Sequence, residues 1–136
     1  MEFFHCFETR GFRDYSLSSK SMNLVGDYEE ASFYNPDKSR KLIVSYVESE
    51  GSKSEVLSVH IENENGESFE VKEFLKSKGK PDSQINDIQI KNYQGELDIR
   101  LENCLKSILK IIEHDLESIV FGKEWKTVSV DWASYK

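Results

Sequence analysis

Three histidines and two cysteines are the side chains of this sequence best suited to act as nucleophiles, bases or metal ligands. Sites of these kinds bring such residues together, usually with at least one pair at short spacing. The histidines, however, lie more than fifty residues apart, and no CxxC, HExxH or HxH pattern occurs. His5 and Cys6 are adjacent, but neighbouring residues of a strand point to opposite faces. We therefore predict no metal site and no catalytic residue.

Each histidine also has an ordinary structural interpretation. His60 alternates with apolar residues on the polar side of a predicted strand, and His114 lies opposite the apolar stripe of a predicted helix. Both positions are typical of surface residues. His5 shares strand parity with Phe3 and Phe7, which favours a partly buried, hydrogen-bonded histidine.

The glycines and the carboxylates give no firmer indication of catalysis. The seven glycines are dispersed and form neither GxGxxG nor GxxxxGK[ST], so no nucleotide or other cofactor is expected. Carboxylate pairs are abundant, as in "ENENGESFE". Acid pairs can support glycosidic or metal chemistry, but on hairpins they usually form solvated surface.

Asp115 departs from its local pattern, because at 100° per residue it falls within the apolar stripe of the predicted helix. A buried carboxylate is costly unless it is paired or hydrogen bonded. Three explanations remain open: a kink or restart of the helix with Asp115 as N-cap, an internal bond to the backbone or an arginine, or a functional acid in a pocket.

Length and charge narrow the function classes. The 136 residues fit one domain, residues 1–136, and the formal charge of −7 disfavours binding to nucleic acid or to an anionic membrane. The same charge favours a basic protein partner. The start of the sequence does not resemble a secretory signal, no window is apolar enough to span a membrane, and nothing indicates a disulfide. We expect a cytoplasmic protein with reduced thiols.

Strand signals dominate the first half of the chain. We predict a first strand in "EFFHCF", a loop in "RDYSLSSKSMNLVGDY", and a hairpin of "EASFY" and "RKLIVSYVE" around the turn "NPDKS". The apolar residues of "KLIVSYVE" fall on both parities, which predicts the central strand, covered on both faces. "SEVLSVHIE" and the residues around Phe69 and Val71 form a second hairpin around Asn65-Gly66.

The second half is dominated by one helix. "VKEFLKSKGKPD" predicts a short helix ended by Gly79 and Pro81, and "NDIQIKNY" predicts a strand with Ile88 and Ile90 on one side. From Gly95 to Gly122 the apolar residues follow helical spacing, and Gly122 stands where helices often end in a left-handed residue. Beyond it Trp125 is expected to pack on the helix end, and residues 128–132 to form a last strand through Val128, Val130 and Trp132.

The helix "ENCLKSILKIIEHDLESIVFG" leading into "KEWKTVSVDW", behind an acidic hairpin region, resembles small bacterial immunity proteins, which neutralise cognate toxins of polymorphic or contact-dependent systems. The resemblance implies a cytoplasmic inhibitor that binds a toxin domain; it assigns no residue. We expect an α+β domain with a mostly antiparallel sheet of five to seven strands and the Gly95–Gly122 helix on one face.

We expect partner binding at an acidic surface with exposed aromatic anchors. Its residues are Glu48, Glu50, Glu55, Glu62, Glu64, Glu67, Tyr46 and Tyr93. Two other classes stay open: a small enzyme with an acid/base site around Asp115 or His5, and a regulatory or structural homo-oligomer. The sequence leaves the oligomeric state undetermined.

Overall fold

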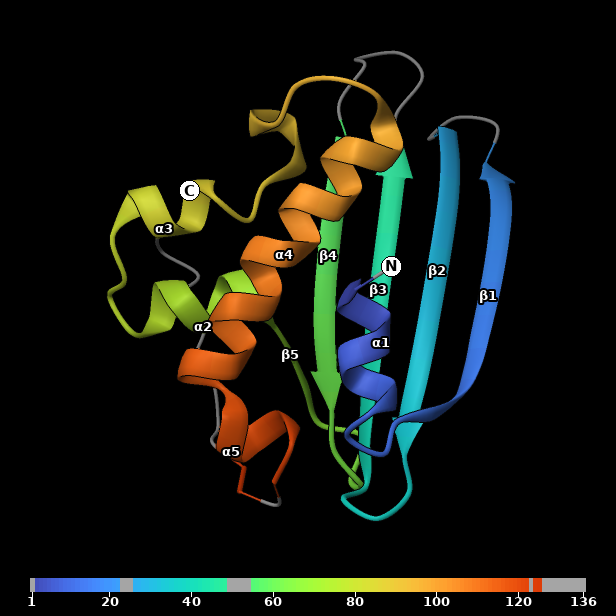
Figure 1. Cartoon of the computed structure of the whole chain (residues 1–136), viewed down its shortest axis with the longest axis vertical. Coiled ribbons are helices and arrows are strands. Elements are labelled where there is room, and N and C mark those ends of the chain that lie inside the picture. Colours follow the sequence, from blue (N-terminus) through green and yellow to red (C-terminus); the bar gives the residue numbers. More distant parts are fainter. Residues whose placement is uncertain (1, 23–25, 49–54, 123, 126–136) are drawn as a thin grey trace.

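The strands follow one another across the sheet in chain order, β1-β2-β3-β4-β5, and every neighbouring pair is antiparallel (Figure 1). The computed structural model describes residues 2–22, 26–48, 55–122 and 124–125, with the backbone alone at residues 2, 19–22 and 26–28. The strands are β1 (Arg13–Met22), β2 (Gly26–Asn35), β3 (Arg40–Glu48), β4 (Glu55–Glu62) and β5 (Ser68–Glu70). The helices are α1 (Glu2–Glu8), α2 (Val71–Ser77), α3 (Asp82–Asn86), the 3-10 turn η1 (Ile90–Asn92), α4 (Leu97–Asp115) and α5 (Glu117–Val120).

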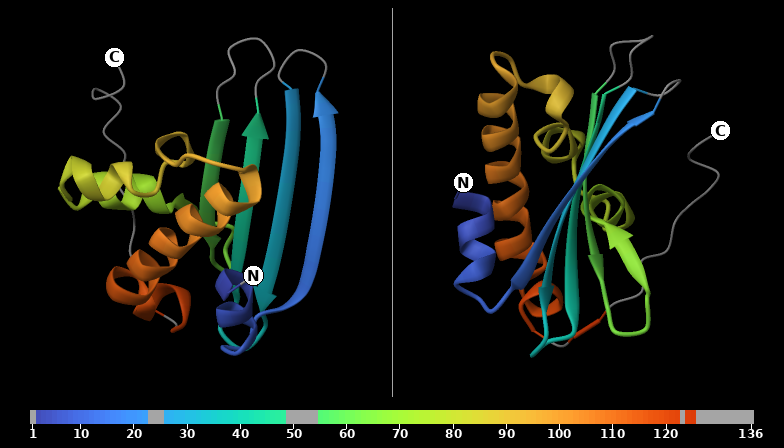
Figure 2. Two further views of the ribbon diagram at one scale, coloured as in Figure 1. Left: turned by 45° about the horizontal axis from the view of Figure 1, so that its top comes forward. Right: turned by 90° about the vertical axis from the view of Figure 1, so that its right-hand side faces the viewer.

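The fold is a single α+β domain, as predicted, with five antiparallel strands and one long helix across one face. Figure 2 shows α1 and α4 on the same side of the sheet. Alternate residues of β3 and β4 are buried towards these helices, among them Leu42, Val59 and Ile61. They pack against the apolar stripe of α4, which includes Ile108 and Ile112. This layer is the hydrophobic core.

Both predicted hairpins are confirmed, because their turns carry the expected chemistry. Asn35 Oδ1 accepts the backbone N–H groups of Asp37 and Lys38 in the β2–β3 turn. Gly66 has a φ of 80° in the β4–β5 turn. β3 is the central strand, as predicted, but only one of its faces is fully buried, since Ile43 and Val47 on the other face are partly exposed.

Two predictions for the first residues are wrong. The segment "EFFHCF" forms α1, not a strand, because Phe3 and Phe7 are four residues apart and share one buried helix face. The stretch predicted as a loop contains β1, which pairs along its length with β2. In β1, Tyr15 and Leu17 alternate with serines. Pairing with a neighbouring strand therefore outweighed the polar composition.

Two further boundaries differ from the sequence pattern. Val71 was expected to continue a strand but starts α2, which ends before Gly79 as predicted. Ile88 and Ile90 are both buried, yet their segment forms a turn and η1, not a strand. Apolar residues two apart thus mark burial here without strand pairing.

The long helix is shorter than predicted and is broken near its end. α4 stops at Asp115, Leu116 has a φ of −123° and a ψ of 9°, and α5 follows immediately. Gly122 is not among the residues with positive φ, so a left-handed helix end does not explain this glycine. Its Cβ position would instead lie 2.5 Å from the carbonyl oxygen of Ser118.

Trp125 packs at the edge of the core. Its ring lies 5.3 Å from that of Phe69 in β5, and the Arg40 guanidinium is 5.2 Å from its centroid. The predicted strand through Val128, Val130 and Trp132 lies outside the described residues. None of the helices in the described ranges has the length and apolar character needed to cross a bilayer.

Candidate functional site

A polar network joins α4 to the sheet beside a surface groove. The Tyr46 hydroxyl donates to Glu55 Oε2 at 2.6 Å, and Arg100 Nη1 donates to Glu55 Oε1 at 2.7 Å. The bond from Arg100, followed by that from Tyr46, lowers the pKa of Glu55. Burial, followed by the bond to Glu55, raises the pKa of Tyr46. Tyr46, Glu55 and Arg100 together therefore hold the first turns of α4 on β3 and β4.

Next to this network an apolar groove opens between α4 and the first strands. It encloses about 140 Å³. Its apolar lining includes Phe4, Tyr15, Leu17, Ala31, Leu101 and Leu105. We call it the β1–α4 groove. It exists because α4 crosses the sheet obliquely and the seven-residue α1 covers only one end of β2 and β3 (Figure 1).

The groove exposes large apolar side chains to solvent. Leu17 is 63% exposed and Tyr15 is 49% exposed, although both lie on the helix side of the sheet. Scattered exposed apolar residues are ordinary, but here they adjoin a concave apolar floor. Such a groove is suited to binding an apolar group, such as a side chain of a protein segment.

Acidic residues border the same groove. Glu29 and Glu30 line it from β2. On α4, the exposed residues Asp98 and Glu102 lie within one helical turn of Leu101, which lines the groove. Glu102 pairs with Lys106 at 3.8 Å, an exposed ion pair that contributes little. The rim therefore favours basic side chains on a bound segment.

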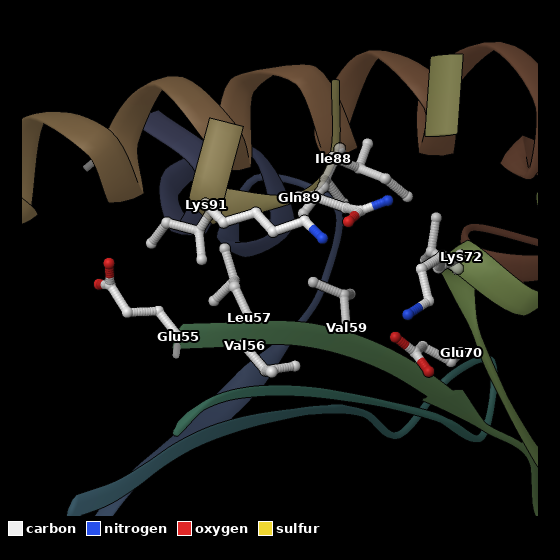
Figure 3. Close-up of a pocket in the computed structure, with 12 residues that line it drawn as sticks. Glu55, Val56, Leu57, Val59, Glu70, Lys72, Ile88, Gln89 and Lys91 are labelled. Atoms are coloured by element: carbon white, nitrogen blue, oxygen red, sulfur yellow. The ribbon is translucent and has the colours of Figure 1, made fainter. Parts of the chain in front are cut away.

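A second pocket, of about 180 Å³, lies along the outer edge of β4 (Figure 3). Its walls come from β4, the β5–α2 junction and residues 88–91. Figure 3 shows Lys91 reaching into the space above Leu57 and Val59, and Lys72 close to Glu70. Its carboxylates do not form an acid/base pair, because Glu55 is already bound by Arg100 and Tyr46.

Asp115 lies at the end of α4 and is mostly buried. Its side chain is 13% exposed; Oδ1 accepts from His114 Nδ1 at 3.0 Å and lies 3.7 Å from Lys80 Nζ. Oδ2 is buried without a hydrogen-bond partner in the described structure. Of the three explanations, the helix does restart here, but Leu116 occupies the N-cap position of α5, so Asp115 as N-cap is wrong. The partners of Asp115 are a lysine and a histidine.

The histidines and cysteines do not converge. His5 is 74% exposed, not partly buried, because in a helix it points away from the face of Phe3 and Phe7. Burial raises the pKa of Cys104 to about 12, which keeps this thiol protonated and unreactive. Both cysteines are free thiols, and no cluster of three or more His, Cys, Asp or Glu side chains that could hold a metal occurs among the described residues.

The predicted acidic surface is divided between two ends of the sheet. Glu48 and Glu55 face each other at one end of β3 and β4, and Glu62 pairs with Lys41 in the register at the other end. Glu62 lies seven positions after Glu55, or about 23 Å along the strand. Glu64 and Glu67 lie in the turn beyond Glu62, so these glutamates do not form one continuous surface.

The remaining predicted binding residues also differ from expectation. Tyr46 is 8% exposed and bonded to Glu55, so the prediction of an exposed anchor is wrong, because its ring lies under α4. Tyr93 is half-buried and its hydroxyl bonds the Asp87 carbonyl and Ser107. Glu64 pairs with the buried Arg40, and Glu50 lies outside the described residues. Leu17 and Tyr15 were missed because their segment was predicted as a loop.

Comparison with known proteins does not assign the chain to a group: no family, curated protein or solved structure matches it.

Proposed function

We propose that this protein is a non-enzymatic binding module of the immunity type, which neutralises a cognate protein toxin in the cytoplasm. The observation that carries the proposal is the β1–α4 groove, where exposed Leu17 and Tyr15 adjoin a concave apolar floor with an acidic rim. The proposed binding surface is this groove and not the acidic residues of β3 and β4.

Binding at the groove combines burial with charge complementarity. An apolar side chain of the toxin covers Leu17 and the floor, which removes apolar surface from water. Lysine or arginine residues beside it meet Glu29 and Asp98, which raises the association rate and disfavours acidic competitors. The inhibitor then blocks the toxin by occupying the basic surface that the toxin needs for its substrate.

The test is co-expression with a toxin domain encoded next to this gene, with growth and complex formation as readouts. We expect rescue of growth and a stoichiometric complex. Leu17→Asp should weaken the complex about tenfold or more, because it places a charge in the apolar contact. Ser16→Asp is the matched control, since Ser16 is the adjacent exposed residue on the opposite face of β1.

The outcomes separate this function from the two alternatives. Equal loss of binding in both variants, or no complex with the neighbouring toxin, contradicts the proposal. A dimer of the free protein that Leu17→Asp dissociates would assign the groove to self-association. The enzyme alternative requires a reaction that is lost when Asp115 or His5 is replaced. His5 is a poor candidate for this role, because its side chain is 74% exposed and its partner, the Glu8 carboxylate, is 3.9 Å away.

A further inference from the structure

The outer edge of β4 is paired over only part of its length. β5 matches β4 at three positions, from Glu62 opposite Ser68 to His60 opposite Glu70. The chain then turns into α2 at Val71 and leaves the line of the sheet. The first residues of β4, from Glu55 onward, therefore have β3 on one side and no strand on the other within the described part of the chain.

The hydrogen-bond alternation identifies the peptide groups that face this open edge. Asn63 N donates to Glu67 O across the β4–β5 hairpin, so odd-numbered residues of β4 face β5 and even-numbered residues face β3. Leu57 and Glu55 continue the odd series beyond the end of β5. Their backbone N–H and C=O groups form no hydrogen bond on this side with any described residue.

The opposite edge of the sheet is less suited to accept a strand. β1 has a register irregularity between Arg13 and Ser16, and Asp14 there has a φ of 56°. Bulges and charged residues are features that discourage strand addition at an edge. The open part of β4 has no bulge and contains neither proline nor lysine.

The pocket of about 180 Å³ beside this edge supplies side-chain contacts. Ile88, Ile90 and Ile108 form an apolar wall, and Lys91 and Lys72 extend from the neighbouring segments (Figure 3). Neither lysine is within 4.0 Å of a carboxylate in the described part of the chain, although Lys72 lies close to Glu70, which lines the same pocket (Figure 3). The other carboxylate of the lining, Glu55, is bound by Arg100, so Lys91 is the cation of this pocket without a carboxylate beside it among the described residues. Because side chains alternate along a strand, apolar residues can face the wall while the residues between them reach the lysines.

We propose that β4 accepts an extended acidic peptide segment of a protein partner as an added strand beyond β5. The segment pairs with the backbone of Leu57 and Glu55, places apolar residues against Ile88 and Ile90, and places carboxylates near Lys72 and Lys91. This site shares the Leu57 side chain with the β1–α4 groove, but it uses the backbone edge of β4 and favours an acidic segment, whereas the groove has an acidic rim and favours a basic one. It therefore does not depend on the proposed function.

The experiment titrates the full chain with a blocked seven-residue peptide of alternating valine and aspartate, followed by amide NMR. We expect the Leu57 and Glu55 amide signals to shift. Two further peptides carry N-methyl groups on one or the other alternate set of backbone nitrogens. One set faces β4 and the other faces away, so only one methylated peptide should lose affinity, by about tenfold or more. Equal affinity of the two methylated peptides overturns the proposal.

Two protein controls address charge and other occupants. The double variant Lys72→Glu with Lys91→Glu should abolish the preference for the aspartate peptide over a lysine-containing peptide. The control variant Lys76→Glu with Lys78→Glu, at the exposed end of α2, should keep this preference. An unchanged preference in the first variant contradicts the carboxylate contact.

In the free protein, the Leu57 amide should exchange with solvent faster than the Ser58 amide, which faces β3. Slow exchange of Leu57 at all protein concentrations means that the chain itself covers the edge, and slow exchange only at high concentration means that a second copy does. Either result overturns the proposal.

Discussion

At the scale of single residues, Arg40 connects several elements of the fold, although the sequence analysis did not identify it. Its side chain is 2% exposed, although arginine is rarely buried. Nε donates to the Ile119 carbonyl at 2.8 Å and Nη2 donates to the Glu124 carbonyl at 3.1 Å. The first residue of β3 is thus bound to α5 and to the segment that contains Trp125.

Arg40→Met should reduce the free energy of unfolding by roughly 2–4 kcal/mol, because several carbonyls lose their donor inside the protein. Urea denaturation followed by circular dichroism measures the loss. Glu64→Gln is the control: Glu64 is 58% exposed, so weakening its pair with Arg40 should cost about 1 kcal/mol or less. A stability of the Arg40 variant within about 0.5 kcal/mol of the parent would refute this assignment.

The Glu55 carboxylate gives a pH dependence with a defined sign. Its pKa is lower in the folded protein than in the unfolded chain, chiefly because Arg100 donates to it. The unfolded chain therefore binds the proton more readily, so the stabilisation is present above the unfolded pKa and disappears as the pH falls through the folded value. Glu55→Gln should be less stable than the parent at pH 7.

The stability difference between Glu55→Gln and the parent should shrink as the pH falls below about 4, the ordinary pKa of glutamate. Thermal unfolding of both proteins between pH 3 and pH 7 measures it. Glu67→Gln is the control, because Glu67 is exposed and has no partner of opposite charge among the described residues. A constant difference across this range would mean that the charge of Glu55 is not the stabilising feature.

At the scale of helices and strands, the sequence predicted correctly the elements whose local residue pattern matches the structure that they adopt. Asn65-Gly66 and the alternation of Leu57 with Ser58 indicate the β4–β5 hairpin from the local sequence alone. The predictions for α1 and β1 were wrong for different reasons. Phe3 and Phe7 fit both a strand and a helix at this length, whereas in β1 the alternation of Tyr15 and Leu17 with serines is short and stands in a polar stretch, so it does not identify a strand.

The candidate sites were less predictable than the fold. The β1–α4 groove depends on the oblique path of α4 and on β1, which the sequence did not reveal. The open edge of β4 depends on the point where β5 gives way to α2 at Val71. A boundary of this kind is decided by packing of Val71 and Phe74 into the core, not by their local pattern.

A variant of Gly122 can test why a glycine follows α5. The reason we expect is the close approach of the Ser118 carbonyl, not the backbone conformation of Gly122. A Cβ there would lie 2.5 Å from Ser118 O, which also accepts the Glu124 N–H. Gly122→Ala should reduce the free energy of unfolding by roughly 1–3 kcal/mol, because the backbone must shift. Gly79→Asn is the control: Gly79 has a φ of 67° with open space around it, and asparagine tolerates this conformation.

Urea denaturation of the two glycine variants measures the loss in the free energy of unfolding for each. Equal losses in Gly122→Ala and Gly79→Asn would indicate a general effect of replacing glycine, and would remove the role given to Ser118.

At the scale of the whole molecule, the formal charge of −7 attracts basic partners from a distance, but it does not select a binding face. Acids lie both at the rim of the β1–α4 groove and at the opposite end of β4, around Glu62 and Glu67. The rim adjoins the exposed side chains of Leu17 and Tyr15. Long-range attraction and contact at the groove therefore make separable contributions to binding.

Two double variants with the same net charge separate these contributions. Glu29→Lys with Asp98→Lys changes the groove rim, and Glu62→Lys with Glu67→Lys changes the far end; each takes the formal charge from −7 by four units to −3. Both should slow association with the proposed toxin partner to a similar extent at low salt, because steering follows overall charge. Only the rim variant should also dissociate about tenfold faster or more, since like charges then meet at the contact. Surface plasmon resonance at low and high salt measures both rates, and faster dissociation of the far-end variant would place the binding surface around Glu62 and Glu67 instead.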